Sequence, residues 1–429
     1  MFDVEVFKKH LQIDEASCIK KLAEGKTKEI YEIKDTNDFV LIRSKNQLTA
    51  FNAARKNDLE GKGAIACRTT TNVFLYLQAL GLHTHFETGV SETDFVAKRC
   101  EMIPIEWVVR RVATGSFLKR NPGVPQGYRF NNLKLETFFK DDENDDPQWS
   151  DEQIISREFV VNGLKIGREE IFLLKRQTKT IFQVLEKAWS LSDCQLIDMK
   201  VEFGVTTKGE IVLADVIDND SWRVWPGGDK RLQLDKQMYR DMTEVTAESL
   251  QELVKNYEKV AELTGDWIRF PKCRALIIMG STADTAFCEK IEKNLTSLGV
   301  MKCVRVCSAH KATTEVLHLV AEYEGDGVPT VVIAVAGRSN GLGPVIAGNS
   351  FLPVINAPPG GPEWISQDIW SSLHTPSGLG CTTALGADEA ALAGAKILAS
   401  HDHMVFGRIL CDQLNNFLSI YKGDKKFTS

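Results

Sequence analysis

The sequence lacks long apolar runs and has no excess of basic residues. None of its apolar runs approaches the roughly 18 residues of a transmembrane helix, and residues 1–10 lack the apolar stretch of a secretory signal. The formal net charge is −6, so there is no general basic field that would attract nucleic acid. These absences predict a cytoplasmic protein with no membrane span and no nucleic-acid partner.

The 10 cysteines are scattered, and none forms a C-x-x-C pair with the spacing of a zinc site. Cys303 and Cys307 are the closest two, and they fall in a strand-like run. We therefore expect reduced, mostly buried thiols rather than a disulfide framework or a metal centre.

The length of 429 residues exceeds what one hydrophobic core usually serves, so two or three domains are expected. Residues 247–263 have the apolar spacing of a helix, and Gly265 and Pro271 then interrupt the pattern. We predict a domain at 1–264, a linker at 265–272 and a second domain at 273–429. The two parts share no internal repeat, which indicates a fusion and not a duplication.

The two parts predict different fold classes. The first mixes strands (29–33 and 39–43) with helices (68–80 and 168–190) without regular alternation, as is typical of α+β domains. The second alternates strands at 275–279, 302–307 and 330–335 with helices at 285–298 and 313–323. These strands are continuous apolar runs, which predicts an α/β domain with a buried parallel sheet.

The run A-E-G-K-T-K-E-I-Y near the N-terminus suggests a phosphate-binding turn. Gly25 would let the backbone approach a phosphate, and Lys26 and Lys28 would neutralise it. An isolated hairpin with exposed lysines has the same pattern, and the run is not a Walker A motif.

A second pattern suggests a magnesium site. Apolar and charged residues alternate along 196–204, which places Asp198, Lys200 and Glu202 on one face of a strand. If a hairpin turns symmetrically about 208–209, Glu202 pairs with Asp215. Two opposed carboxylates repel each other, and Mg²⁺ binds one or two carboxylates together with phosphate oxygens. An ordinary solvent-exposed polar face is the alternative.

Cations and one acidic run complete the polar features of this part. Arg110 and Ser116 lie in the run R-R-V-A-T-G-S-F-L-K-R, and Arg223 follows the acidic strand end. Arginine suits two-point contacts to phosphate or carboxylate, although each of these residues alone is more often a surface arginine. The run 141–146 has the composition of a solvated loop.

Taken together, these motifs resemble the phosphoribosylaminoimidazole-succinocarboxamide (SAICAR) synthetase family. The similarity covers about residues 13–263 and rests on E-G-K-T-K-E-I-Y, F-F-K-D-D-x-x-D-D-P, D-M-K-x-E-F-G and L-A-D-V-I-D-N-D-S-W-R. It implies a ligase that uses ATP and Mg²⁺ to join L-aspartate to carboxyaminoimidazole ribotide (CAIR) through an acyl phosphate. The implied roles are ATP-phosphate binding by Gly25, Lys26 and Lys28, Mg²⁺ binding by Glu202 and Asp215, ribotide binding by Arg110, Ser116 and Arg223, and contact with the aspartate or CAIR carboxylate by Lys140, Asp146 and Lys200.

The C-terminal part has three polar loops, each following a predicted strand. Ser281 and Asp284 lie in the first, Ser308, His310 and Lys311 in the second, and Arg338 and Ser339 in the third. Doubly wound sheets bind ligands at the carboxyl ends of their strands, and a helix N-terminus there favours anions. Asp284 could cap that helix or bind a ribose, and both remain open.

The loops S-A-H-K and G-R-S-N-G-L-G-P resemble the aminoimidazole ribotide (AIR) carboxylase family, in its CO₂-using class, over about residues 273–418. The resemblance implies a flavodoxin-like three-layer domain that carboxylates AIR to CAIR without ATP, biotin or metal. His310 would move the proton at the ring carbon, Lys311 and Ser339 would orient CO₂, and Ser281, Asp284, Ser308 and Arg338 would hold the ribotide. Ala283 departs from the family, which usually has serine there.

The two resemblances make one chemical sequence, because the second part would make the CAIR that the first consumes. The whole chain resembles the animal-type bifunctional enzymes of purine biosynthesis, which implies a homo-octamer; the apolar helix expected at 404–420 could contribute a subunit contact or simply core packing. Three alternatives are a ligase with a ribotide-sensing C-terminal module, a nonenzymatic scaffold, and a nucleotide kinase, although signatures of the last are absent.

Overall fold

The structure is a computed structural model that describes residues 18–50, 55–270, 272–360 and 365–428. It consists of two compact units, Met1–Ile268 with Leu414–Ser429, and Arg269–Gln413. The sequence assigned all of 273–429 to the second domain, whereas the residues from Leu414 onward group with the first unit. Phe417 explains this difference, because its ring lies 5.9 Å from that of Phe172 and the Arg176 guanidinium lies 4.0 Å above it. The apolar spacing of the residues predicts that this segment is helical, but it does not show which unit the end of the helix packs against.

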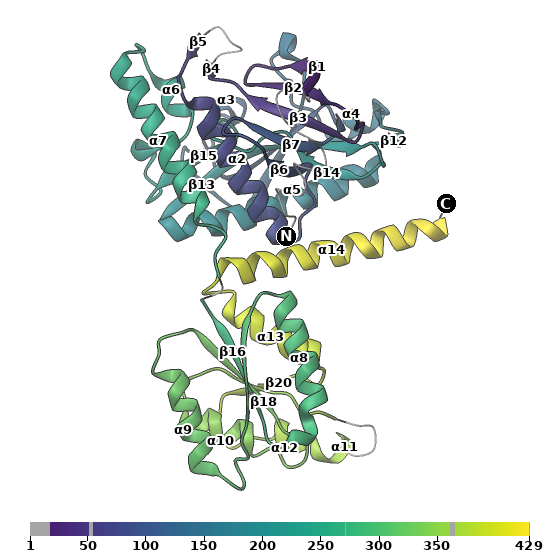
Figure 1. Cartoon of the computed structure of the whole chain (residues 1–429), viewed down its shortest axis with the longest axis vertical. Helices are drawn as coiled ribbons and strands as arrows, with labels where there is room; N and C mark the ends of the chain where they lie inside the picture. Colours follow the sequence, from purple (N-terminus) through teal and green to yellow (C-terminus); the bar gives the residue numbers. More distant parts are fainter. Residues whose placement is uncertain (1–17, 51–54, 271, 361–364, 429) are drawn as a thin grey trace. The chain divides into compact units, whose positions relative to one another are not determined.

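The first unit is built on two sheets of antiparallel strand pairs (Figure 1). The five-stranded sheet runs in the order β1 (Cys18–Glu24), β2 (Lys28–Ile33), β3 (Phe39–Ser44), β7 (Asp94–Lys98), β6 (Phe86–Gly89). The six-stranded sheet runs β10 (Arg129–Phe139), β9 (Ile105–Val112), β13 (Cys194–Thr206), β14 (Ile211–Ala214), with β15 (Trp222–Pro226) and β8 (Cys100–Met102) also paired to β13. The hairpin β4 (Gln47–Ala50) and β5 (Arg55–Asp58) is separate.

Helices complete this unit and confirm the α+β expectation. The longest are α2 (Lys62–Ala79), α5 (Arg168–Trp189) and α7 (Ala247–Gly265), with short α3 (Ser116–Arg120), α4 (Asp151–Ser156) and α6 (Gln237–Asp241) between them. Local chemistry defines where α7 starts, because Thr246 accepts a hydrogen bond from the Ser249 N–H at 3.2 Å. The predicted helix at 247–263 therefore begins where the sequence indicated.

The second unit is doubly wound. Its sheet is parallel, in the order β17 (Met301–Val306), β16 (Arg274–Met279), β18 (Thr330–Val335), β19 (Val354–Asn356), β20 (Cys381–Thr383). Helices α8 (Thr285–Ser297) and α13 (Ala387–Leu398) cover one face, and α9 (Thr313–Glu324) and α10 (Leu342–Asn349) cover the other (Figure 1). Every residue of β16 and β18 is buried, as the apolar runs predicted. Numbered along this unit, the strands lie in the order 2-1-3-4-5, which is the order of flavodoxin-like sheets.

The remaining helices are α11 (Ile365–Asp368), α12 (Trp370–Leu373) and α14 (His403–Thr428). Within the described ranges, no helix combines the length and apolarity that a membrane span requires. The nine cysteines whose side chains the structure describes are free thiols, five of them buried.

Candidate active sites

A charged cavity of about 710 Å³ opens in the first unit and contains most of the residues predicted for that part. It lies where the turn after β1, the β4–β5 hairpin, the loop after β10, strand β13 and the loop after β14 meet. Its lining includes Gly25, Lys26, Lys28, Lys140, Asp146, Lys200, Glu202 and Asp215 among the predicted residues, and Lys45, Lys56, Glu106, Asp142, Asp218 and Asp220 among others.

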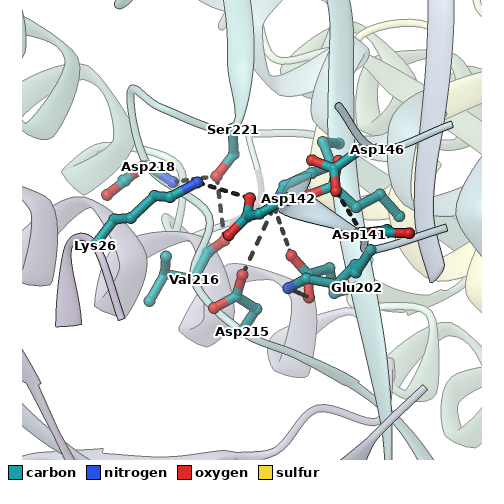
Figure 2. A network of polar contacts seen from close by, with 12 residues as sticks. Lys26, Asp141, Asp142, Asp146, Glu202, Asp215, Val216, Asp218 and Ser221 are labelled. Atoms are coloured by element: carbon teal, nitrogen blue, oxygen red, sulfur yellow. Dashed lines mark hydrogen bonds and ion pairs between the residues drawn. The ribbon is translucent and has the colours of Figure 1, made fainter. Parts of the chain in front are cut away.

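The Gly25 turn presents its lysines to this cavity. The Gly25 N–H donates to the Lys28 carbonyl at 2.8 Å, which closes the turn between β1 and β2. Lys26 donates to the Asp142 carboxylate at 2.7 Å (Figure 2). Lys28 forms an ion pair with Asp215. The turn is therefore not a plain exposed hairpin, because both of its lysines face carboxylates that line the cavity.

The carboxylate pair shares the cavity, but its predicted register is wrong. Glu202 stands opposite Ala214 and not opposite Asp215. The hairpin has a three-residue loop, closed by the Thr206 N–H donating to the Glu210 carbonyl at 2.9 Å, and Gly209 adopts a left-handed φ of 76° within it. Loops of this type add one residue to a two-residue turn, which moves the pairing by one position. Asp215 itself follows the strand end with φ 64°.

Lysines surround both carboxylates. Glu202 is 2% exposed and accepts hydrogen bonds from Lys140 at 2.7 Å and Lys200 at 2.5 Å. Burial opposes ionisation, but the charges of Lys200, Lys140 and Lys28 lower the pKa of Glu202 to about 2. Burial also opposes the charge on Lys200, yet Glu202 and Glu106 raise its pKa above the ordinary value. The pair is therefore a charged network, and not a solvent-exposed polar face.

The donor set fits a magnesium ion that is bound together with a nucleotide. Among the described residues, no group of three or more His, Cys, Asp or Glu side chains forms a metal cage. Mg²⁺ does not need such a cage, since it takes one or two carboxylates and completes its shell with phosphate oxygens and water. Glu202 and Asp215 supply those two carboxylates in one cavity.

The two predicted ribotide arginines meet on one buried carboxylate. Asp198 on the central strand β13 is in register with Arg110 on β9 and with Arg223 on β15. Each guanidinium donates to Asp198 Oδ2 at 2.6 Å. Gly115, the residue before Ser116, packs against Arg223, since a Cβ on Gly115 would come 2.7 Å from Arg223 Nη2, and Ser116 itself is exposed. The structure thus brings Arg110 and Arg223 together on one carboxylate, and the ribotide role of these arginines and of Ser116 remains a prediction.

The acidic run contributes more to the cavity than the sequence indicated. Lys140 and Asp146 line the cavity as expected, and so does Asp142, which the composition of the run had assigned to a solvated loop. Asp146 accepts the Asp141 N–H at 2.8 Å and so shapes the loop (Figure 2). On either side of this loop in the chain, Phe139 and Trp149 stack with their ring centroids 4.1 Å apart.

A buried lysine pair behind the cavity is the main feature that sequence reasoning missed. Lys62 and Lys236 contact Asp220 Oδ2 at 3.5 and 2.9 Å, and Tyr257 donates to its other oxygen at 3.4 Å. Lys62 is 1% exposed. The only sequence signal was Asp218 and Asp220 following the strand end, and nothing pointed to lysines on α2 and beside α6.

In the second unit, the three predicted loops follow the adjacent strands β16, β17 and β18 at one edge of the sheet. The Gly280 N–H donates to the Val335 carbonyl and the Cys307 N–H to the Met279 carbonyl, both at 2.9 Å. His310 is exposed and stands against Gly341, where a Cβ would come 2.7 Å from His310 Nε2. The second and third loops therefore touch at the predicted proton-transfer residue.

A buried amide network fixes the third loop. Ser339 has a left-handed φ of 44°, and Asn340 beside it is 3% exposed. The Asn340 N–H donates to Ser371 Oγ at 2.8 Å, and its side chain donates to Ser372 Oγ at 3.0 Å. Ser339, which is predicted to orient CO₂, therefore precedes a residue that is hydrogen-bonded to two serines of α12. Arg338 and Lys311 are exposed on the same loops, and Ser308 is half-buried.

The first loop differs in one detail from a plain helix cap. Ser281 Oγ accepts the Ala283 N–H at 3.3 Å. Asp284 occupies the position before α8, but its side chain makes no capping hydrogen bond there. Partial burial raises the pKa of Asp284. Capping therefore does not explain this aspartate, which leaves its carboxylate for another partner.

The first unit has a cavity lined by lysines and carboxylates, and the second is a doubly wound domain with polar loops at its strand ends. This combination fits a two-domain enzyme that handles phosphorylated substrates. The family model described as SAICAR synthetase matches residues 21–257, and the one described as AIR carboxylase matches residues 274–416.

Relatives cover nearly the whole chain. The "Probable multifunctional protein ADE2" of Caenorhabditis elegans is 64% identical over 409 residues, which cover 95% of this chain and 96% of that protein. The human "Bifunctional phosphoribosylaminoimidazole carboxylase/phosphoribosylaminoimidazole succinocarboxamide synthetase" is 54% identical over 410 residues, with the same two coverages. A solved structure of "SAICAR synthetase (Type-2) in complex with ADP" is 29% identical with a TM-score of 0.50, covering 56% of this chain and 96% of that one.

The chain belongs to the family of bifunctional AIR carboxylase/SAICAR synthetase enzymes. It is a bifunctional enzyme of purine biosynthesis, with a ligase domain followed by a carboxy-lyase domain. A C-terminal module that only senses ribotide is not favoured, since the AIR carboxylase model spans almost all of the second unit.

Proposed function

We propose that the first unit binds ATP and Mg²⁺ in its charged cavity and joins L-aspartate to CAIR, giving SAICAR, ADP and phosphate. The observation that carries this proposal is that the Gly25 turn, the two carboxylates and six lysines line a single cavity. Glu202 and Asp215 would hold the Mg²⁺, which would offset phosphate charge when bound. Lys26 and Lys28 would neutralise the phosphates, as expected where positioning and electrostatics dominate phosphoryl transfer.

The chemistry would proceed in two transfers. The bond between the γ-phosphorus of ATP and its bridging oxygen breaks, ADP leaves with the electron pair, and the phosphoryl group forms a P–O bond with the CAIR carboxylate, which Lys140 and Lys200 orient. The amine of L-aspartate then forms a C–N bond with the activated carbon, and the C–O bond to phosphate breaks with its electron pair leaving on phosphate. Arg110, Ser116 and Arg223 would hold the ribotide throughout, and Asp146 would shape the loop that carries Lys140.

We propose that the second unit carboxylates AIR with CO₂ and needs no ATP, biotin or metal. A C–C bond forms between the ring carbon and CO₂, and His310 takes the ring proton, because imidazole titrates near neutral pH. Lys311 and Ser339 would orient CO₂, while Ser281, Asp284, Ser308 and Arg338 would hold the ribotide. The contact of His310 with the third loop supports this arrangement.

We further propose that the enzyme acts in the cytoplasm as a homo-octamer, as its similarity to the animal-type bifunctional enzymes implies. Light scattering of the purified chain measures the subunit number directly.

The deciding experiment is AIR carboxylation in bicarbonate buffer without ATP, L-aspartate or Mg²⁺, comparing the intact chain with His310→Asn. We expect CAIR from the intact chain and at least about 100-fold less from the variant. The same variant, supplied with CAIR, ATP, Mg²⁺ and L-aspartate, should retain full synthetase activity, which controls for folding. If the intact chain forms no CAIR, the proposed carboxylase activity is wrong.

A further inference from the structure

One exposed ion pair joins two of the segments that line the synthetase cavity. Lys26, on the turn between β1 and β2, donates to Asp142, on the loop after β10, at 2.7 Å although 116 residues separate them (Figure 2). The two side chains are 44% and 67% exposed. An ion pair this exposed is weak, so a stronger anion can take Lys26 away from Asp142.

Nucleotide binding would supply that anion. The proposed function assigns Lys26 to the ATP phosphates, and a phosphate carries more charge than one carboxylate. Deeper in the cavity, Glu202 retains Lys140 and Lys200 as partners. Asp142 would instead lose its cation, since Lys26 is its only ion-pair partner among the described residues.

Asp142 differs in this respect from Asp146, the other cavity-lining carboxylate of the same loop. Asp146 already accepts the Asp141 N–H at 2.8 Å, so it is engaged in holding the loop. The stacked rings of Phe139 and Trp149, together with the Trp149 N–H donating to the Thr137 carbonyl at 2.9 Å, brace the base of this loop. The Asp142 carboxylate is thus held near the cavity, and its partner is a lysine ammonium.

We propose that Asp142 binds the ammonium group of L-aspartate after ATP has drawn Lys26 away, so that the substrate ammonium replaces the lysine ammonium. This inference rests on the proposed synthetase function and identifies the residue that selects an amino dicarboxylate over a plain dicarboxylate. It also favours an order, because nucleotide binding removes the lysine that competes with the amine for Asp142. The ammonium gives one proton to solvent before the amine lone pair attacks, and the bonds then made and broken are those of the proposed synthetase reaction.

The test compares Asp142→Asn with Glu143→Gln, a matched removal of charge from an exposed neighbour in the same acidic run. We expect Asp142→Asn to raise the KM for L-aspartate about tenfold or more, as the loss of a hydrogen bond to a charged group predicts. Its KM for ATP should stay unchanged or fall, because Lys26 is freed. Glu143→Gln should alter neither constant.

Two further measurements separate this role from a structural one. Succinate has the two carboxylates of L-aspartate without the amine, so its inhibition constant should be the same in both chains. Hydroxylamine can replace L-aspartate as a small neutral acceptor, and CAIR-dependent ADP release with it should survive in Asp142→Asn.

The outcomes that overturn the inference are distinct. An unchanged KM for L-aspartate, or equal losses with succinate and hydroxylamine, would show that Asp142 does not recognise the amine. A raised KM for ATP alone would assign Asp142 to the nucleotide site. If the intact chain releases no ADP with CAIR and hydroxylamine, the acyl-phosphate function itself fails, independently of Asp142.

Discussion

Asp198 is the carboxylate on which the two ribotide arginines converge, and its replacement by asparagine tests how the first unit tolerates buried charge. Asp198, Arg110 and Arg223 have side chains that are 6%, 4% and 15% exposed. Asp198→Asn keeps the size of the side chain and removes its charge. Arg110 would retain Glu136 at 2.6 Å, whereas Arg223 would retain only the Gln237 amide oxygen at 3.3 Å.

The size of the stability loss depends on the buried arginine that loses its carboxylate partner, which is Arg223. Removing one member of a buried ion pair typically costs about 3–5 kcal/mol, because the remaining charge stays desolvated. Asparagine still offers one acceptor oxygen and Arg110 keeps a carboxylate, so the lower end applies. We expect the free energy of unfolding of the first unit to fall by about 3 kcal/mol, which moves its urea midpoint down by roughly 1 M or more.

Tryptophan fluorescence during urea unfolding measures this effect, since six of the 8 tryptophans in the sequence lie in the first unit. Asp229→Asn is the matched control, because Asp229 makes the same kind of pair with Arg231 at 2.5 Å on the surface. The control should not move the midpoint. If Asp198→Asn shifts it no more than Asp229→Asn does, the reasoning from burial is wrong.

Two other predictions concern the second site and the pH dependence of the first unit. Gly341→Ala should reduce carboxylation about 100-fold and leave the synthetase activity intact, because the added Cβ would lie 2.7 Å from His310 Nε2 and would displace that ring. Gly325→Ala is the control and should leave both activities unchanged, because the atom nearest to its added Cβ is 3.6 Å away. Burial raises the pKa of Asp235 to about 6, above its unfolded value. The native state therefore binds the proton more tightly, and this contribution to stability is present below about pH 4 and lost as the pH rises through about 6. Asp235→Asn should remove that slope from urea midpoints measured between pH 4 and 6, and an unchanged slope would assign it to other groups.

The sequence was most informative where periodicity and chemistry agreed. Strands 275–279 and 330–335 were recognisable because a sheet covered on both faces requires continuous apolar runs. Glu202 and Asp215 were recognisable because charges alternated with apolar residues along a strand. The pairing was still misplaced by one position, since a symmetric two-residue turn was assumed and Gly209 permits a longer loop.

Other features depended on contacts that leave no local pattern. Lys62 and Asp220 are 158 residues apart, and a lysine near the start of a helix usually indicates an exposed position. Asp142 lay in a run whose composition is typical of solvent-exposed loops, and only the position of Lys26 reveals that it faces the cavity. Local composition describes the average environment of a segment, whereas one side chain in it can have a different partner.

The charges of the cavity explain how an acidic chain can bind polyanionic substrates. Among the described residues that line it, eight carboxylates face six lysines, which gives the lining a formal charge of −2. Lysines in such a site are already paired, so an incoming phosphate competes with a carboxylate for each of them. A divalent cation that arrives with the nucleotide offsets the excess negative charge of the lining itself and gives Asp215 a replacement for Lys28. The proposed exchange of partners at Lys26 and Asp142 is an example of this competition at an exposed ion pair. It links the binding of ATP to the release of Asp142 for the amine of L-aspartate.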